Sequence, residues 1–150
     1  MKVWSPAFKY GGEIPEKYSC DGANLSIPLY FALLPEGSRS LVLIMVDPDA
    51  PGGDFVHWVL YSIPAGSKVL PGGMGSAQIN ERGIREGVND FGESGYGGPC
   101  PPSGTHRYYI RLYALDIPSD FEPGLSREAL LKRMEGHVLA EAEWMGTYSR

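Results

Sequence analysis

Basic residues are few in this sequence: 13 Lys and Arg stand against 18 Asp and Glu, which gives a net charge of −5. No basic run exceeds two residues, so the electrostatic footprint of a nucleic-acid-binding protein is missing. The longest apolar run, residues 41–46, is far shorter than the ~20 residues that span a bilayer. The first residues also lack the apolar core of a signal peptide. We therefore expect a cytoplasmic protein with no transmembrane segment and no nucleic-acid partner.

Cysteine is almost absent, and Cys20 and Cys100 lie too far apart to form a Cys-x-x-Cys motif. A zinc site built on thiolates is therefore disfavoured. In a cytoplasmic protein the favoured interpretation is two reduced thiols. Both cysteines stand beside turn residues, however, so a Cys20–Cys100 disulfide stays open.

Glycine and proline, in contrast, are plentiful, with 20 and 13 copies in 150 residues. That share exceeds the average but stays below that of low-complexity chains, so it indicates a folded chain with many turns. A length of 150 residues predicts one domain over 1–150. Residues 83–104 hold seven Gly and three Pro, which predicts a long loop, and long ordered loops are usually functional.

The apolar pattern favours strands. Residues 40–46 form a nearly continuous apolar run, as in a strand buried on both faces, whereas residues 107–116 alternate. Short strands separated by Gly and Pro turns are typical of a sandwich or a barrel. The sequence therefore predicts a mainly β fold with antiparallel strands over 29–34, 40–47, 56–63 and 107–116.

One helix is expected near the C-terminus, over residues 126–143. Ser126 can cap it, and apolar residues from Leu131 to Met145 recur at steps of three and four. Gly136 weakens the middle of this helix and marks a candidate break. His137 is then interpreted as a solvated or capping residue of the helix.

Two of the three histidines stand where strands begin beside loops. His57 follows a Gly-rich turn, and His106 ends the long loop. Two carboxylates, Asp47 and Asp49, directly follow the buried strand. We interpret Asp47 as a site residue, whereas a turn and a site explain Asp49 equally well.

The long loop offers further groups to the same site. Gly98 and Cys100 can present backbone N–H groups to an anion. His106 and Tyr108 are two residues apart on a strand and therefore share a face, whereas Arg107 points to the other face. For Arg107 we expect a structural pairing with an acidic turn such as the one at Asp21. A carboxylate, two imidazoles and a phenol could thus surround a small polar pocket suited to a phosphoryl or carboxyl group.

These motifs resemble those of the phosphatidylethanolamine-binding proteins, a family that includes Raf kinase inhibitor protein and plant flowering regulators. The similar segments, in the family order, are 47–51 (Asp-Pro-Asp-Ala-Pro), 57–58 (His-Trp), 98–102 (Gly-Pro-Cys-Pro-Pro) and 104–108 (Gly-Thr-His-Arg-Tyr). Residues 18–26 and the Gly-Pro-Cys-Pro-Pro loop are similar to the bacterial and archaeal branch. The resemblance covers roughly residues 18–144.

The resemblance implies an antiparallel β-sandwich with a C-terminal helix and a small anion-binding pocket at one end. The ligand-binding residues implied are Asp47, Asp49, His57, Gly98, Cys100, Pro102, His106 and Tyr108. No cofactor and no metal are implied. Two prolines bracket the tight turn after the strand predicted over 40–47, which makes a cis peptide bond between Ala50 and Pro51 a hypothesis that the resemblance strengthens.

Three functions remain in competition. The favoured one is a non-enzymatic binding module for phosphate, phosphoethanolamine or a phosphorylated side chain, regulating a protein kinase or protease; a homodimer is left open. The alternative is a metal-dependent enzyme with Asp47, His57 and His106 as ligands. A serine hydrolase using Ser94 or Ser103 ranks last, because the sequence has no Gly-x-Ser-x-Gly motif.

Overall fold

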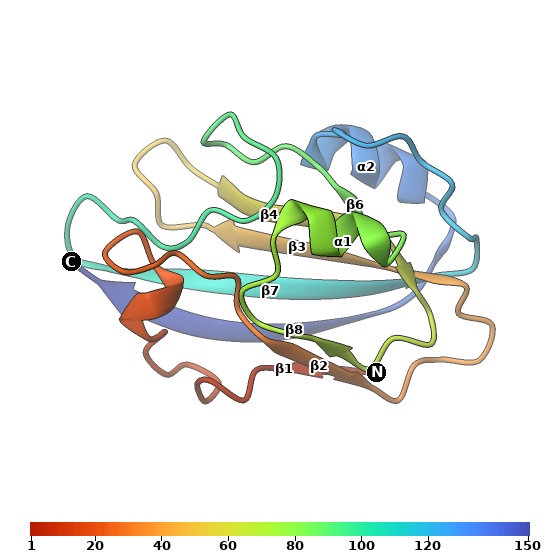
Figure 1. Cartoon of the computed structure of the whole chain (residues 1–150), viewed down its shortest axis with the longest axis horizontal. Helices are drawn as coiled ribbons and strands as arrows, with labels where there is room; N and C mark the ends of the chain where they lie inside the picture. Colours follow the sequence, from red (N-terminus) through yellow and green to blue (C-terminus); the bar gives the residue numbers. More distant parts are fainter.

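A computed structural model describes all residues, 1–150, and shows two antiparallel sheets packed as a β-sandwich (Figure 1). The smaller sheet has the order β1-β2-β5, with strands Lys2–Trp4, Leu29–Ala32 and Val69–Leu70. The larger has the order β6-β4-β3-β7-β8, with strands Arg85–Glu86, Phe55–Pro64, Ser40–Asp47, Thr105–Leu115 and Val138–Ser149. The helices are a 3-10 turn at Glu16–Tyr18, α1 at Ser76–Glu81 and α2 at Arg127–Met134.

The larger sheet is covered on both faces along its central strand, β3. All eight of its residues are buried, and it pairs with β4 on one side and β7 on the other. Leu41, Leu43 and Met45 face the core between the two sheets. Val42, Ile44 and Val46 face a second core, which α2 covers with Leu130 and Met134. A strand that is buried on both faces needs apolar side chains on both, which explains the continuous apolar run of β3.

Most predicted strands are confirmed. The strand over 40–47 has the predicted bounds, and those at 29–34, 56–63 and 107–116 differ by a few residues. The sequence reading missed the short strands β1, β5 and β6, the helix α1 and, most seriously, β8. No helix of the chain is both long and apolar enough to cross a membrane.

The predicted helix over 126–143 is correct only in its first half. The Ser126 side chain accepts a hydrogen bond from the Ala129 N–H, so the cap is confirmed. The helix ends at Met134, and Gly136 adopts a φ of +80° that favours glycine. Strand β8 follows and pairs with β7 over its whole length. His137 therefore lies between α2 and β8 rather than within a helix, and it contacts Asp116 at 2.9 Å.

The favoured interpretation of the cysteines is wrong: Cys20 and Cys100 form a disulfide. Their separation of 80 residues in the sequence is no guide, because the two loops run side by side. The Cys20 N–H donates to the Pro99 carbonyl at 3.1 Å, and the two Cα atoms are 5.4 Å apart. That distance lies in the usual range for a disulfide.

The expected cis bond at Ala50–Pro51 is also wrong, because the chain has no cis peptide. The turn closes by other means. The Asp47 carboxylate accepts a hydrogen bond from the Asp49 N–H at 2.7 Å, and the Gly53 N–H donates to the Ala50 carbonyl at 3.0 Å. Gly53 has a φ of +98° and supplies the reversal that a cis proline would otherwise provide.

Candidate functional site

A cavity of about 180 Å³, the histidine cavity, lies at one end of the larger sheet. Asp47 ends β3, whereas His57 and His106 stand near the starts of β4 and β7. Because β3 is antiparallel to both neighbours, these three positions fall at the same end of the sheet. The lining residues are Asp47, Ala50, Pro51, Phe55, His57, Phe91, Cys100, Pro101, Pro102 and His106.

His106 forms a buried pair with Asp47, in which Nδ1 lies 2.6 Å from the carboxylate Oδ2. A carboxylate can only accept, so Nδ1 carries the hydrogen and donates it. The second oxygen of Asp47 accepts the Asp49 N–H. This fixes the ring of His106 and leaves its Nε2 without a partner in the protein.

His57 is fixed in the same manner by a backbone carbonyl. Its Nδ1 donates to the Gly97 oxygen at 2.7 Å, which again leaves Nε2 without a protein partner. The rings of Phe55, Phe91 and Tyr108 lie 5.0–5.4 Å from the imidazole, centroid to centroid. This burial lowers the pKa of His57 from its ordinary value, because desolvation disfavours the charged ring.

The two ring orientations limit what the cavity can offer a ligand. With Nδ1 as the donor in both rings, a neutral imidazole presents only a lone pair at Nε2. Each Nε2 becomes a donor only when its ring takes up a proton. In this geometry a neutral histidine therefore cannot donate a hydrogen bond to an anion in the cavity.

Asp49 lies beside the cavity rather than in its wall, and it pairs with Arg107. The Arg107 Nε and Nη2 donate to the two carboxylate oxygens at 2.9 and 2.8 Å, and the Arg107 N–H donates as well. Arg107 therefore makes the expected structural pairing with an acidic turn, but the turn is that of Asp49 and not that of Asp21, which pairs with Arg150 at 3.1 Å. The bidentate guanidinium lowers the pKa of Asp49 to about 2.

This ion pair makes an acid-dependent contribution to stability. The folded pKa of about 2 lies below the value of ~3.9 in an unfolded chain, so the contribution is present above pH 4 and is lost as pH falls through 2. We expect Asp49→Asn to be less stable than the native protein at pH 7 and equally stable near pH 1.5, measured by urea unfolding. Asp120→Asn, which changes an exposed carboxylate in no ion pair, is the control. A stability gap that does not change with pH would contradict the assignment.

Gly98 and Tyr108 lie behind the cavity wall. The Gly98 N–H already donates to the Asn24 side-chain oxygen at 2.9 Å. Tyr108 is fully buried, its hydroxyl has no hydrogen-bond partner, and burial raises the pKa of that hydroxyl. Of the predicted ligand-binding residues, the structure thus brings Asp47, His57, Cys100, Pro102 and His106 together in the lining of one cavity.

The sequence reading missed the aromatic part of the wall. Phe55 and Phe91 line the cavity and stack edge to face, with ring centroids 4.8 Å apart. Phe55 directly precedes the strand predicted over 56–63, whereas Phe91 shares the Gly-rich loop with Ile84, Val88 and Tyr96, so the sequence offers no distinct signal for Phe91. Aromatic rings suit the methylene groups or the ammonium group of a ligand.

Neither catalytic alternative gains support from the geometry. No three His, Cys, Asp or Glu side chains are arranged to hold one metal ion. Ser94 lines a different cavity, together with Asn24 and Tyr96, and no serine hydrogen-bonds to either histidine.

Comparison with known proteins identifies relatives across the whole chain. The sequence model of one family, Phosphatidylethanolamine-binding protein, matches residues 4–149. A UPF0098 protein of Methanothermobacter thermautotrophicus is 49% identical over 150 residues, which is 100% of this chain and 99% of that protein. A UPF0098 protein of Aquifex aeolicus is 46% identical over 154 residues, covering 100% of this chain and 89% of the relative.

Two solved structures have the same fold. The crystal structure of a phosphatidylethanolamine-binding protein homolog from Chlamydia trachomatis superposes with a TM-score of 0.92 at 42% identity, covering 99% of this chain and 97% of the other. The E. coli protein YBCL, described as a new member of the mammalian phosphatidylethanolamine-binding protein family, superposes with a TM-score of 0.91 at 31% identity. The match covers 99% of this chain and 98% of YBCL. Both similarities extend over the strands that build the histidine cavity.

Proposed function

Because the chain belongs to the phosphatidylethanolamine-binding protein family, we propose that its histidine cavity binds the phosphoryl group of a small zwitterionic headgroup. The observation that carries this proposal is the pair of imidazoles whose Nδ1 atoms are engaged and whose Nε2 atoms are not. Once protonated, the two rings offer two N–H donors to phosphoryl oxygens. Asp47 is the counter-ion of a charged His106.

The carboxylate of Asp47 also bears on the kind of anion. A second negative charge on the ligand would be repelled by Asp47, whereas a ligand that carries its own ammonium group would not. Phe55 and Phe91 supply aromatic faces near the site, and such faces attract an ammonium group. A zwitterion such as phosphoethanolamine or its diester therefore suits the cavity better than inorganic phosphate.

Size restricts the ligand to the headgroup. Pockets that enclose a drug-sized molecule measure roughly 300–1,000 Å³, and the histidine cavity measures about 180 Å³. A lipid that used this site would have its acyl chains outside it. A phosphorylated side chain presents the same phosphoryl chemistry, so regulation of a protein kinase or protease through such a side chain is part of the proposal.

The test is the pH dependence of binding, measured by calorimetric titration with glycerophosphoethanolamine between pH 7.5 and 5.5. This diester keeps one negative charge throughout, so changes in affinity report on the protein. Binding to Nε2–H requires proton uptake, and affinity should rise by up to about tenfold per pH unit for each proton taken up. Because burial lowers the pKa of His57, its share of the rise should occur at the acidic end of the range.

Variants assign the effect to each ring. His57→Ala and His106→Ala should each flatten the curve, whereas His137→Ala, outside the cavity, should leave it unchanged. Phosphoethanolamine, a monoester, should level off, because it loses its second charge below a pKa of ~6. Diester affinity that is independent of pH, or absent at every pH, would overturn the proposal.

A further inference from the structure

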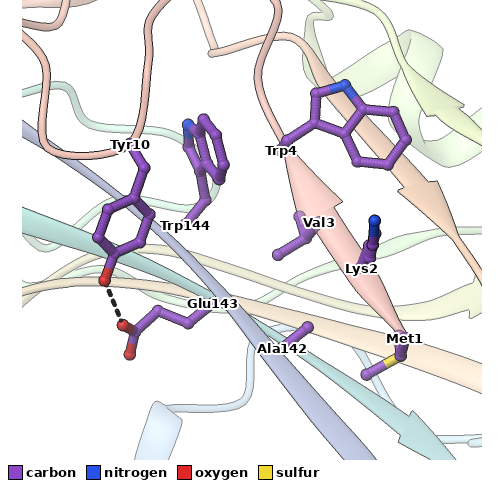
Figure 2. Close-up of a pocket in the computed structure, with 8 residues that line it drawn as sticks. All are labelled: Met1, Lys2, Val3, Trp4, Tyr10, Ala142, Glu143 and Trp144. Carbon is purple, nitrogen blue, oxygen red and sulfur yellow. Dashed lines mark hydrogen bonds between the residues drawn. The ribbon is translucent and has the colours of Figure 1, made fainter.

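One half of the Cys20–Cys100 disulfide belongs to the lining of the histidine cavity. Cys100 lines the cavity, and the disulfide joins it to Cys20 on a separate segment of the chain. The larger groove between β1 and β8, with a volume of about 630 Å³, contains no cysteine and shares no residue with the histidine cavity (Figure 2). A change in the redox state of the cysteines therefore acts directly on the histidine cavity.

Residues 100–103 have few other bonds to hold them in place. Before this stretch, the Pro99 carbonyl accepts a hydrogen bond from the Cys20 N–H at 3.1 Å. After it, Gly104 and Arg150 exchange two backbone hydrogen bonds of 3.0 Å. Within the stretch no backbone hydrogen bond is formed, and its two prolines have no N–H to donate. The disulfide is therefore the one covalent link between this part of the cavity lining and another segment.

The segment that carries Cys20 also supports the group that orients His57. The Asn24 side chain of this segment accepts a hydrogen bond from the Gly98 N–H at 2.9 Å. The neighbouring Gly97 carbonyl accepts from the His57 Nδ1 at 2.7 Å. Releasing the disulfide thus frees part of the lining and loosens the support of a ring that the proposed function uses.

The two sulfur atoms differ in exposure and in charge. Cys20 is exposed, whereas Cys100 is half-buried. The Arg150 Nη1 lies 3.6 Å from the Cys100 Sγ, and the same guanidinium pairs with Asp21 through Nη2 at 3.1 Å. A positive charge beside a sulfur stabilises its thiolate, and a stabilised thiolate is the better leaving group. A thiol reductant is therefore expected to attack Cys20 and to displace Cys100.

We propose that the Cys20–Cys100 disulfide is a redox switch of the histidine cavity, operated by a dithiol reductant; the proposal rests on the proposed headgroup binding. One thiolate of the dithiol attacks the Cys20 Sγ, forms a mixed disulfide and releases Cys100 as a thiolate. The second thiol of the reductant attacks the reductant sulfur of the mixed disulfide and releases Cys20. The protein gains two electrons and two protons, and the dithiol becomes a cyclic disulfide.

Reduction weakens headgroup binding, because the ligand must then order residues 100–103 at a cost in conformational entropy. Native protein reduced with dithiothreitol should bind glycerophosphoethanolamine at least about tenfold more weakly than oxidised protein, measured by calorimetric titration at pH 7. The double variant C20S/C100S should bind as weakly as the reduced protein, with or without dithiothreitol. Leu130→Ala is the control: it destabilises the second core, away from the cavity, and should leave the affinity of the oxidised protein unchanged.

The ligand should in turn protect the disulfide. Coupling between two binding events is reciprocal, so the diester must favour the oxidised form by the factor by which reduction weakens its binding. Saturating diester should therefore make the reduction midpoint of the protein more negative by about 30 mV for each tenfold difference in affinity. Titration in a dithiothreitol redox buffer measures this shift.

The mobility of residues 100–103 gives a measurement that needs no ligand. The backbone order parameter of the Cys100 amide, measured by NMR relaxation, should fall from about 0.85 in the oxidised protein to below about 0.6 after reduction. Trp4 and Trp144 are the internal controls, because they lie in the β1–β8 groove (Figure 2). Their amides should remain as rigid as in the oxidised protein.

The outcomes separate this proposal from that on headgroup binding. Equal diester affinity in the two redox states overturns the switch and leaves the proposed function intact. The switch is also wrong if Leu130→Ala weakens binding as much as reduction does, because lost stability alone would then explain the effect. Absence of diester binding to the oxidised protein overturns the proposed function. In that case a rigid Cys100 amide in the reduced protein shows that the disulfide does not control the cavity either.

Discussion

Replacing Cys20 and Cys100 together with serine should lower the free energy of unfolding by about 2–5 kcal/mol. The disulfide closes a loop of 80 residues, and a cross-link over such a distance strongly restricts the unfolded chain. For a protein of this length the loss corresponds to a fall in melting temperature of about 4–20 °C. Thermal unfolding followed by circular dichroism measures it.

Reductant provides the internal control for this prediction. Cys20 is exposed, so a small phosphine can reach the bond and should reproduce the loss in the native protein. The same reductant should have no effect on the double serine variant. Equal melting temperatures of the native and the variant protein, with and without reductant, would show that the disulfide contributes nothing to stability.

Gly98→Ala should both destabilise the protein and weaken headgroup binding at least about tenfold. A Cβ at this position would collide with the Tyr18 carbonyl oxygen and the Asn24 side-chain oxygen. Backbone atoms cannot move aside as a flexible side chain can, so overpacking by one methyl group costs about 1–3 kcal/mol. The displaced segment would move Gly97, whose carbonyl fixes the ring of His57.

The matched control is Gly52→Ala, in the turn that follows β3. A Cβ there meets no atom within 4 Å, and its φ is not in the left-handed region. It should therefore leave stability and diester affinity unchanged. If Gly98→Ala behaved like Gly52→Ala in both measurements, the tight packing behind the cavity wall would be irrelevant to binding.

The sequence predicted a strand correctly where its residues follow a single hydrophobic pattern. The continuous apolar run predicted β3 with its observed bounds, because only a strand buried on both faces needs such a run. Strand β8 was missed because two periods compete in the same residues. Leu131, Met134 and Val138 follow a helical spacing, whereas Ala140, Ala142, Trp144 and Tyr148 follow the spacing of two that pairing with β7 selects.

The candidate site was likewise predicted only in part. Motifs at three separated places indicated Asp47, His57 and His106, and antiparallel pairing brings them to one end of the sheet. Their hydrogen-bond partners were not predictable, because these depend on loops that meet only in three dimensions. The pairing of Arg107 with Asp49 instead of Asp21 and the disulfide are both of this kind.

The full burial of β3 has a consequence for how the histidine cavity can respond to its ligand. Amides of a central strand that is covered on both faces exchange with solvent mainly through global unfolding, whereas segments without regular pairing open locally. Asp47 is the last residue of β3, but the part of the cavity lining at Cys100, Pro101 and Pro102 belongs to a segment with no strand partner. Opening the cavity at Asp47 therefore requires unfolding of the whole domain, whereas the segment at Cys100 to Pro102 can open at a lower free energy. Occupancy of the cavity is therefore transmitted to the surface more readily through its loop residues, at Ala50, Pro51, Phe91 and Cys100–Pro102, than through β3.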